Sequence, residues 1–129
     1  MEREEKQNLV AKLYNNLRFA KIKADMQTNN EKNEKKEIYT KAKGIRINSK
    51  YLSNKEYFQI VEFYEFLKEN PNLTNDEIRE ILNSNNKFSF LRKLDQTVPD
   101  LFEELKDHGV MYVAVSYVNK KHGFKSLNI

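Results

Sequence analysis

The chain has 129 residues and a formal net charge of +4, with 39% hydrophobic and 12% aromatic residues. This length and apolar content suit one ordinary domain with its own core. The sequence contains no cysteine, which excludes disulfides, thiolate catalysis and cysteine-based zinc sites. It also has no run near the ~20 apolar residues that span a bilayer and no secretory signal, so we expect a cytoplasmic protein.

Charge is distributed unevenly along the chain. Residues 1–50 carry 13 Lys and Arg against 7 Asp and Glu, whereas residues 51–129 carry 10 against 12. A polyanion should therefore prefer the first half of the chain or the basic stretch near the C-terminus.

Residues 1–27 are predicted to form an amphipathic helix. Apolar residues recur there at spacings of 3 and 4, which places them on one narrow stripe. The stripe consists of Val10, Leu13, Leu17, Ala20 and Ala24. Docking of this stripe on the rest of the chain is the simpler interpretation. Because the spacing also fits the a and d positions of a short coiled coil, a homodimer through Val10, Leu13 and Leu17 is the alternative.

Residues 28–50 form a predicted basic, polar linker. The segment TNNEKNEKKEIYTKAK (28–43) has almost no apolar content to drive burial, and residues 44–47 alternate as one short strand would. The cations of this linker suggest either a solvated connection or an auxiliary arm that follows a DNA backbone. The possible arm residues are Lys41, Lys43, Arg46 and Lys50.

Two capping boxes mark the first helices of the compact segment that follows. In each box a hydroxyl can accept from the backbone N–H three residues later, while a glutamate reaches back to the first N–H. Ser53 and Glu56 form the first box, and Thr74 and Glu77 form the second. The first predicts a strongly apolar helix that ends before Pro71, because a residue before proline avoids helical geometry.

Further helices and a hairpin are predicted beyond the second box. Apolar residues at helical spacing predict a helix up to about Gln96, and Pro99 introduces another that Gly109 ends. Residues 110–118 (VMYVAVSYV) are rich in β-branched and aromatic side chains, which predicts a strand. A turn and a returning antiparallel strand over residues 119–129 complete the predicted hairpin.

Two passages within residues 51–129 carry a resemblance to a known family. ENPNLTNDEIREILN and TVPDLFEELKDHGV are similar to the first-turn-second helix passage and to the end of the recognition helix in winged helix-turn-helix domains. The resemblance covers Tyr57 to Ile129. It implies a mainly α, winged-helix-like fold with a C-terminal β-hairpin, preceded here by the long N-terminal helix. It also implies that a recognition helix enters the major groove while the wing contacts the DNA backbone.

Two pieces of the chain compete for the role of recognition helix. The later piece, residues 100–107, is mainly acidic, so phosphates would repel it. The earlier piece carries side chains suited to phosphates and base edges, and the wing tip adds two lysines. A basic hairpin tip also serves solubility and protects a sheet edge, which is the plainer interpretation of those lysines. The candidate nucleic-acid-binding residues are Asn85, Asn86, Lys87, Arg92, Lys93, Lys120 and Lys121.

The sequence gives little support for catalysis. His108 and His122 have no nucleophile or metal ligand at a recognisable spacing, and isolated glycines cannot form a phosphate-cradling loop. Glu62, Glu65 and Glu69 are interpreted as the solvated strip of a helix and not as a cation site. We therefore expect a non-enzyme without a metal or other cofactor.

The leading prediction is a small DNA-binding regulator or accessory protein that acts through a helix-turn-helix and a basic wing. The alternative is a protein-binding module, such as an inhibitor or adaptor carried by a phage or plasmid. Such a module would use its acidic faces and an aromatic surface of Phe58, Phe63 and Phe66, although burial of these rings is the simpler expectation.

Overall fold

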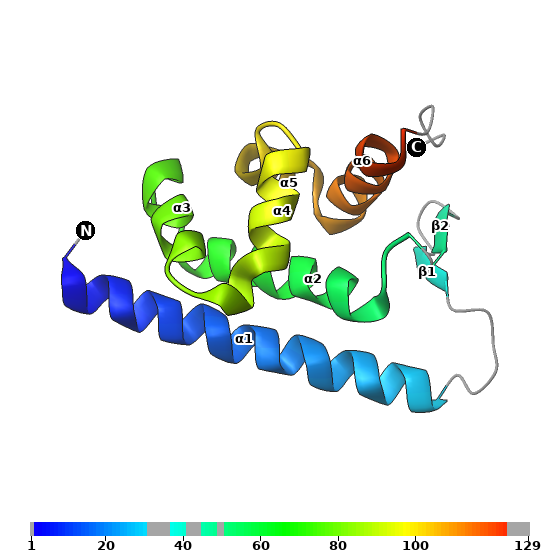
Figure 1. The fold of residues 1–129 in the computed structure, drawn as a ribbon, viewed down its shortest axis with the longest axis horizontal. Helices are drawn as coiled ribbons and strands as arrows, with labels where there is room; N and C mark the ends of the chain where they lie inside the picture. The colour runs from blue at the N-terminus through cyan, green and yellow to red at the C-terminus, as the bar shows by residue number, and fades with distance from the viewer. Residues whose placement is uncertain (1, 31–36, 41–44, 49–50, 124–129) are drawn as a thin grey trace.

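The computed structural model describes residues 2–30, 37–40, 45–48 and 51–123, with side chains described for 2–25 and 51–123. The elements in chain order are α1 (Arg3–Asn30), β1 (Glu37–Thr40), β2 (Ile45–Asn48), α2 (Asn54–Glu69), α3 (Asn75–Asn83), the 3-10 helix η1 (Asn86–Phe88), α4 (Ser89–Thr97), α5 (Leu101–His108) and α6 (Val110–His122). Figure 1 shows α1 along one side of the molecule, α2 running beside it, and α3 to α6 on the opposite side of α2. Among the described residues, no helix is long and apolar enough to cross a membrane.

The apolar stripe of α1 packs on the rest of the chain. Leu13 and Ala20 have no exposed surface, and Leu17 is only 8% exposed. Val10 is partly buried against the same core, so the docking interpretation is confirmed. In this conformation the surface that a homodimer through Val10, Leu13 and Leu17 would use is occupied within the chain itself.

Both predicted capping boxes are present. The Ser53 hydroxyl accepts from the backbone N–H of Glu56 at 3.1 Å, and the Glu56 carboxylate accepts from the N–H of Ser53 at 3.0 Å. The corresponding distances between Thr74 and Glu77 are 3.2 and 3.0 Å. These bonds satisfy N–H groups that would otherwise lack partners at the starts of α2 and α3. As predicted, α2 ends before Pro71.

The aromatic face of α2 forms much of the core. Phe63 and Phe66 are fully buried, and the Phe63 ring meets that of Phe102 edge to face with centroids 6.0 Å apart. Burial of these rings is therefore confirmed, and Phe58 is half-buried. The polar strip differs from the expectation, because Glu62 is only 7% exposed and faces α1 instead of solvent.

The main correction to the predicted fold concerns residues 110–122. They form α6 and not a strand, so the predicted C-terminal β-hairpin and winged-helix fold are wrong. Its residues Val113, Val115, Tyr117 and Val118 are each at most 1% exposed, which means that neighbouring helices enclose most of the helix circumference. A short continuous apolar run suits a buried strand and a buried helix equally well, and tertiary packing decides between them.

Glycines bound α6 at both ends. Gly109, with φ of 89°, is the only residue between α5 and α6, and Gly123, with φ of 69°, ends the helix in the left-handed conformation. The expected wing tip, Lys120 and Lys121, is instead the last turn of α6, where cations interact favourably with the helix dipole. Residues 124–129, the expected second strand, lie outside the described residues.

The predicted linker contains a strand pair. β1 and β2 are antiparallel, with Ile38 opposite Ile47 and Tyr39 opposite Arg46. β2 corresponds to the expected short strand, whereas β1 was not predicted because its sequence has little apolar content. β1 contacts α2, which places the pair beside the body of the molecule.

Candidate nucleic-acid interface

Two of the sequence-predicted binding residues are engaged in holding the fold. The Arg92 guanidinium donates from Nη1 to the backbone oxygens of Leu82 at 2.6 Å and Asn85 at 2.8 Å. The Asn85 side chain accepts from the backbone N–H of Lys87 at 2.8 Å and so caps η1. Both side chains stabilise the connection from α3 to α4, and one Arg92 bond satisfies the Leu82 carbonyl in the last turn of α3.

The other predicted residues are exposed and come from three elements, η1, α4 and α6. Lys93 and Lys121 lie near Tyr117, with the Lys121 Nζ 5.5 Å from the centre of its ring. Burial raises the pKa of the Tyr117 hydroxyl, and the positive charge of Lys93 opposes that rise. Lys120 is in the last turn of α6, and Asn86 starts η1.

The predicted auxiliary arm is mostly outside the described residues. This applies to Lys41, Lys43 and Lys50, while Arg46 is described only as a backbone position on β2. The arm therefore stays a prediction.

Lys87 contributes to a groove that brings together three separate elements. We call it the basic groove; its volume is about 470 Å³ and it opens between α1, the first turns of α2, and η1. Its lining residues are Tyr14, Leu17, Arg18, Lys21, Ile22 and Asp25 of α1, Lys55 and Gln59 of α2, and Lys87 of η1.

The cations of the basic groove differ from those on the other flank of α1. On that flank Lys12 pairs with Glu69 at 2.7 Å and Lys23 pairs with Glu62 at 2.5 Å. By contrast, the groove cations form no ion pair with any residue that the structure describes. These cations are Arg18, Lys21, Lys55 and Lys87.

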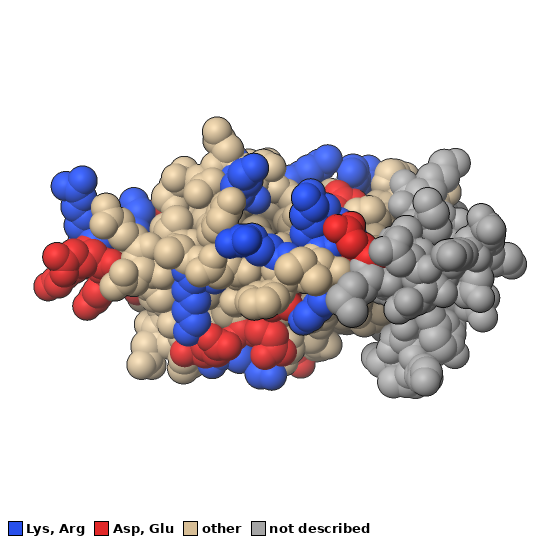
Figure 2. Space-filling model, turned by 90° about the horizontal axis from the view of Figure 1, so that it is seen from below, with Lys and Arg blue, Asp and Glu red and all other residues tan. Residues whose placement is uncertain are grey.

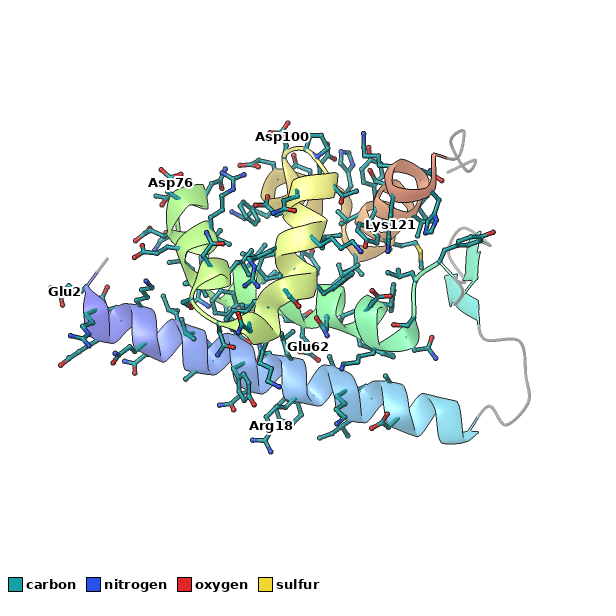
Figure 3. All side chains as sticks on the ribbon, viewed as in Figure 1. Glu2, Arg18, Glu62, Asp76, Asp100 and Lys121 are labelled. Carbon is teal, nitrogen blue, oxygen red and sulfur yellow. The ribbon has the colours of Figure 1, made fainter. Side chains whose placement is uncertain are left out.

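The arrangement is visible on the molecular surface. Figure 2 looks onto α1 and shows Lys and Arg side chains across the middle of this face. Figure 3 places Glu62 between α1 and α2, whereas Arg18 projects from the outer side of α1. Gathering four cations around a lining that contains one carboxylate, Asp25, costs folding free energy, and it produces a positive potential that attracts anions.

Gln59 adds an unsatisfied polar group to the wall of the basic groove. The residue is 9% exposed, and its Oε1 is buried without a hydrogen-bond donor in the described part of the chain. Leaving a buried acceptor unpaired costs about 1–3 kcal/mol. The Oε1 atom itself is closed off from solvent, so a ligand N–H group in the groove would remove this cost only after the Gln59 side chain turned outward.

Sequence reasoning missed three of the four groove cations. A signal for two of them exists in α1, where the groove-lining residues directly follow the residues of the apolar stripe. Thus Tyr14 follows Leu13 and Arg18 follows Leu17. Because these residues directly follow the stripe, they lie on the side of α1 next to the surface that docks on α2. The spacing does not indicate that Lys55 and Lys87 lie beside them.

Comparison with protein families, curated proteins and solved structures finds no match to this chain. Among the described residues, no group of three or more His, Asp or Glu side chains is placed to hold a metal ion. The chemistry of the basic groove is therefore the basis for a proposed function.

Proposed function

We propose that the protein binds nucleic acid through the basic groove and acts as a small regulator or accessory protein. The observation that carries the proposal is the convergence of four cations without ion-pair partners, in the described structure, from α1, α2 and η1. The proposal keeps the expected class of partner but assigns the contact to a different surface. It uses neither a recognition helix nor a wing.

The other groups in the groove favour nucleic acid over a simple inorganic anion. Nucleic-acid sites combine cations for the phosphates with aromatic and amide groups for the bases. The basic groove has this combination, since Tyr14 and Gln59 share its wall with the cations.

The protein-binding alternative has lost most of its aromatic surface, although its acidic faces stay exposed. Phe63 and Phe66 are inside the core and cannot contact a partner. In the described part of the chain, the large hydrophobic side chains that stay exposed are Phe19 and Ile22. Two side chains form a patch far smaller than the several hundred Å² that mark a protein interface.

Fluorescence anisotropy of labelled oligonucleotides, measured at several salt concentrations, tests the proposal. Each phosphate contact contributes about 0.7 to 0.9 to the slope of log affinity against log salt. The double variant Arg18→Gln/Lys21→Gln should therefore bind more weakly and lower this slope by about 1.4 to 1.8.

The matched control is Arg3→Gln/Lys106→Gln, which removes the same charges from exposed positions outside the groove lining. The control should retain the native salt slope. Equal losses in the two double variants would show that net charge and not the groove governs binding, which would refute the proposed site.

A further inference from the structure

Besides its cations, the wall of the basic groove contains aromatic, aliphatic and amide side chains, which phosphate binding alone does not require. Tyr14 contributes a half-buried aromatic ring, Ile22 is 52% exposed, and Gln59 contributes an amide whose Oε1 is buried and unpaired. Phosphates have no use for an aromatic ring or an additional acceptor. Both groups suit a base.

We propose that the basic groove holds an unpaired base of a single-stranded nucleic acid, while the flanking phosphates contact the groove cations. This inference rests on the proposed nucleic-acid binding and specifies its form. The ligand chemistry is that of a nucleoside phosphate, supplied by a strand and not by a duplex.

The buried acceptor on Gln59 is the first reason for an unpaired base. Every nucleobase carries an N–H donor on its Watson–Crick edge, and in a duplex that donor is already used in base pairing. An unpaired base can enter the groove and donate from this edge to Gln59 Oε1 once the Gln59 side chain turns outward. In a duplex the amino N–H groups that stay free lie within the major groove and do not enter such a hollow. Asp25, the acidic residue of the lining, is also an acceptor and suits a base edge better than a phosphate.

The size and shape of the groove are the second reason. A volume of about 470 Å³ lies within the range of about 300–1,000 Å³ typical of sites for small ligands. A flexible strand can place one nucleotide in such a hollow. The phosphates of a duplex lie on a convex surface and would meet only the rim.

Exposed apolar surface beside the groove is the third reason. Phe19 is 56% exposed and precedes Ile22 by three residues, so the two side chains are neighbours on the outer side of α1. Aromatic and apolar side chains next to cations are typical of proteins that bind single strands, because unstacked bases cover them. A strand leaving the groove past Ile22 would meet Phe19.

Anisotropy with three labelled probes of equal length tests the inference: a single strand, the same strand without bases, and a duplex. We expect the native protein to bind the intact strand at least about tenfold more tightly than the abasic strand. We also expect weaker binding to the duplex. Equal affinity for the intact and abasic strands, or tighter binding to the duplex, would overturn the inference while leaving nucleic-acid binding intact.

The variant Gln59→Leu tests the role of the amide directly. It should reduce the preference for the intact strand over the abasic strand by about tenfold without changing the salt slope. Because the substitution removes an unpaired buried acceptor, the melting temperature should stay the same or rise. The control Gln96→Leu, at an exposed position on α4, should leave the preference unchanged. An unchanged preference or a marked fall in melting temperature for Gln59→Leu would assign Gln59 a purely structural role and contradict the inference.

Two further outcomes separate this inference from the proposed function. Absence of binding to all three probes at low salt would refute both. Adenosine monophosphate and an unlabelled strand can be compared as competitors at equal total concentrations of nucleotide. If adenosine monophosphate displaced the labelled strand as effectively as the unlabelled strand does, the groove would be a site for free nucleotides, and the single-strand assignment would be wrong.

Discussion

Gln59 and Glu62 lie close together on α2 and are equally hidden from solvent, with exposed fractions of 9% and 7%. Glu62 forms an ion pair with Lys23 that links α2 to α1, so its charge is compensated. The Oε1 of Gln59 has no such partner in the described structure. Tyr117 and Asn119 also carry buried oxygens without partners in the described structure, so what singles out Gln59 as a candidate ligand contact is its place in the wall of the basic groove.

Arg92, a predicted DNA contact, has a structural role instead. Its charge and its place in the earlier candidate recognition helix suggested a DNA contact, but two backbone carbonyls occupy its Nη1. Sequence cannot distinguish these uses, because the guanidinium binds carbonyl and phosphate oxygens through the same donors. The structure leaves Lys87 as the member of the predicted set that lines the groove.

The first prediction concerns Glu77 and Glu103, whose acid titration should change stability. The pKa of Glu77 is lowered chiefly because its carboxylate accepts from the backbone N–H of Thr74, and that of Glu103 chiefly because it accepts from the Asn75 amide. A lowered pKa means that the charged carboxylates favour the folded state. This stabilisation is complete above the usual glutamate pKa of about 4.3 and is lost as the pH falls through the lower folded-state values.

Chemical denaturation over a series of pH values measures this effect. The free energy of unfolding should fall as the pH drops below about 4.3, and Glu77→Gln should show a shallower fall than the native protein. The control Glu4→Gln changes an exposed glutamate of α1. If both variants retained the native pH dependence, the proposed contribution of the Glu77 carboxylate would be wrong.

At the scale of elements, the second prediction tests whether α1 is docked. Leu13 is fully buried on the docked face of α1, whereas Phe19 on the same helix is 56% exposed. Replacing a buried leucine with alanine costs about 2–5 kcal/mol, and a surface substitution changes stability by about 0.5 kcal/mol. Leu13→Ala should therefore lower the free energy of unfolding far more than Phe19→Ala.

Denaturation midpoints measured at several protein concentrations complete this test. A stripe that packs within one chain gives midpoints that do not depend on concentration, whereas a stripe that pairs two copies gives midpoints that rise with concentration. A concentration-dependent midpoint that Leu13→Ala abolishes would favour the homodimer through Val10, Leu13 and Leu17 over the docked helix.

The third prediction concerns α6, where the structure departs from the sequence pattern. Cα chemical shifts measured by NMR should be helical throughout Val110–His122. Ser116→Pro should destabilise the protein by about 3 kcal/mol or more, because proline removes a helical hydrogen bond and clashes with the preceding turn. Strand-type shifts in this segment would restore the predicted hairpin and contradict the fold.

The elements that sequence predicted well are those fixed by local interactions. The capping boxes at Ser53 and Thr74 and the proline at 71 act within a few residues, so the bounds of α2 follow from the sequence alone. α6 has no side-chain cap at its start, and its apolar residues carry no clear helical period. Its conformation depends on the helices that enclose it, which a local pattern cannot reveal.

In the whole molecule, the candidate site also depends on tertiary packing that a local sequence pattern does not reveal. The sequence identified Lys87, but the groove also requires Arg18 and Lys21 on α1 and Lys55 on α2. These residues meet only because α1 docks along α2 with a particular rotation. Before the fold was known, the cations of residues 1–50 indicated a positive half of the chain but not a surface.

The distribution of ion pairs around α1 distinguishes the basic groove from the rest of the described surface. A net charge of +4 is modest and by itself favours no partner. What distinguishes the molecule is that one flank of α1 pairs its lysines with glutamates of α2, while the other presents its cations to solvent beside the basic groove. We propose this second flank as the place where nucleic acid binds.

Acetylation of lysines with and without a bound oligonucleotide, followed by mass spectrometry, locates the contact most directly. We expect Lys21, Lys55 and Lys87 to react more slowly in the complex, while Lys68 and Lys106 react at the same rate in both states. Protection of Lys120 and Lys121 without protection of the three groove lysines would contradict the account and assign binding to the end of α6.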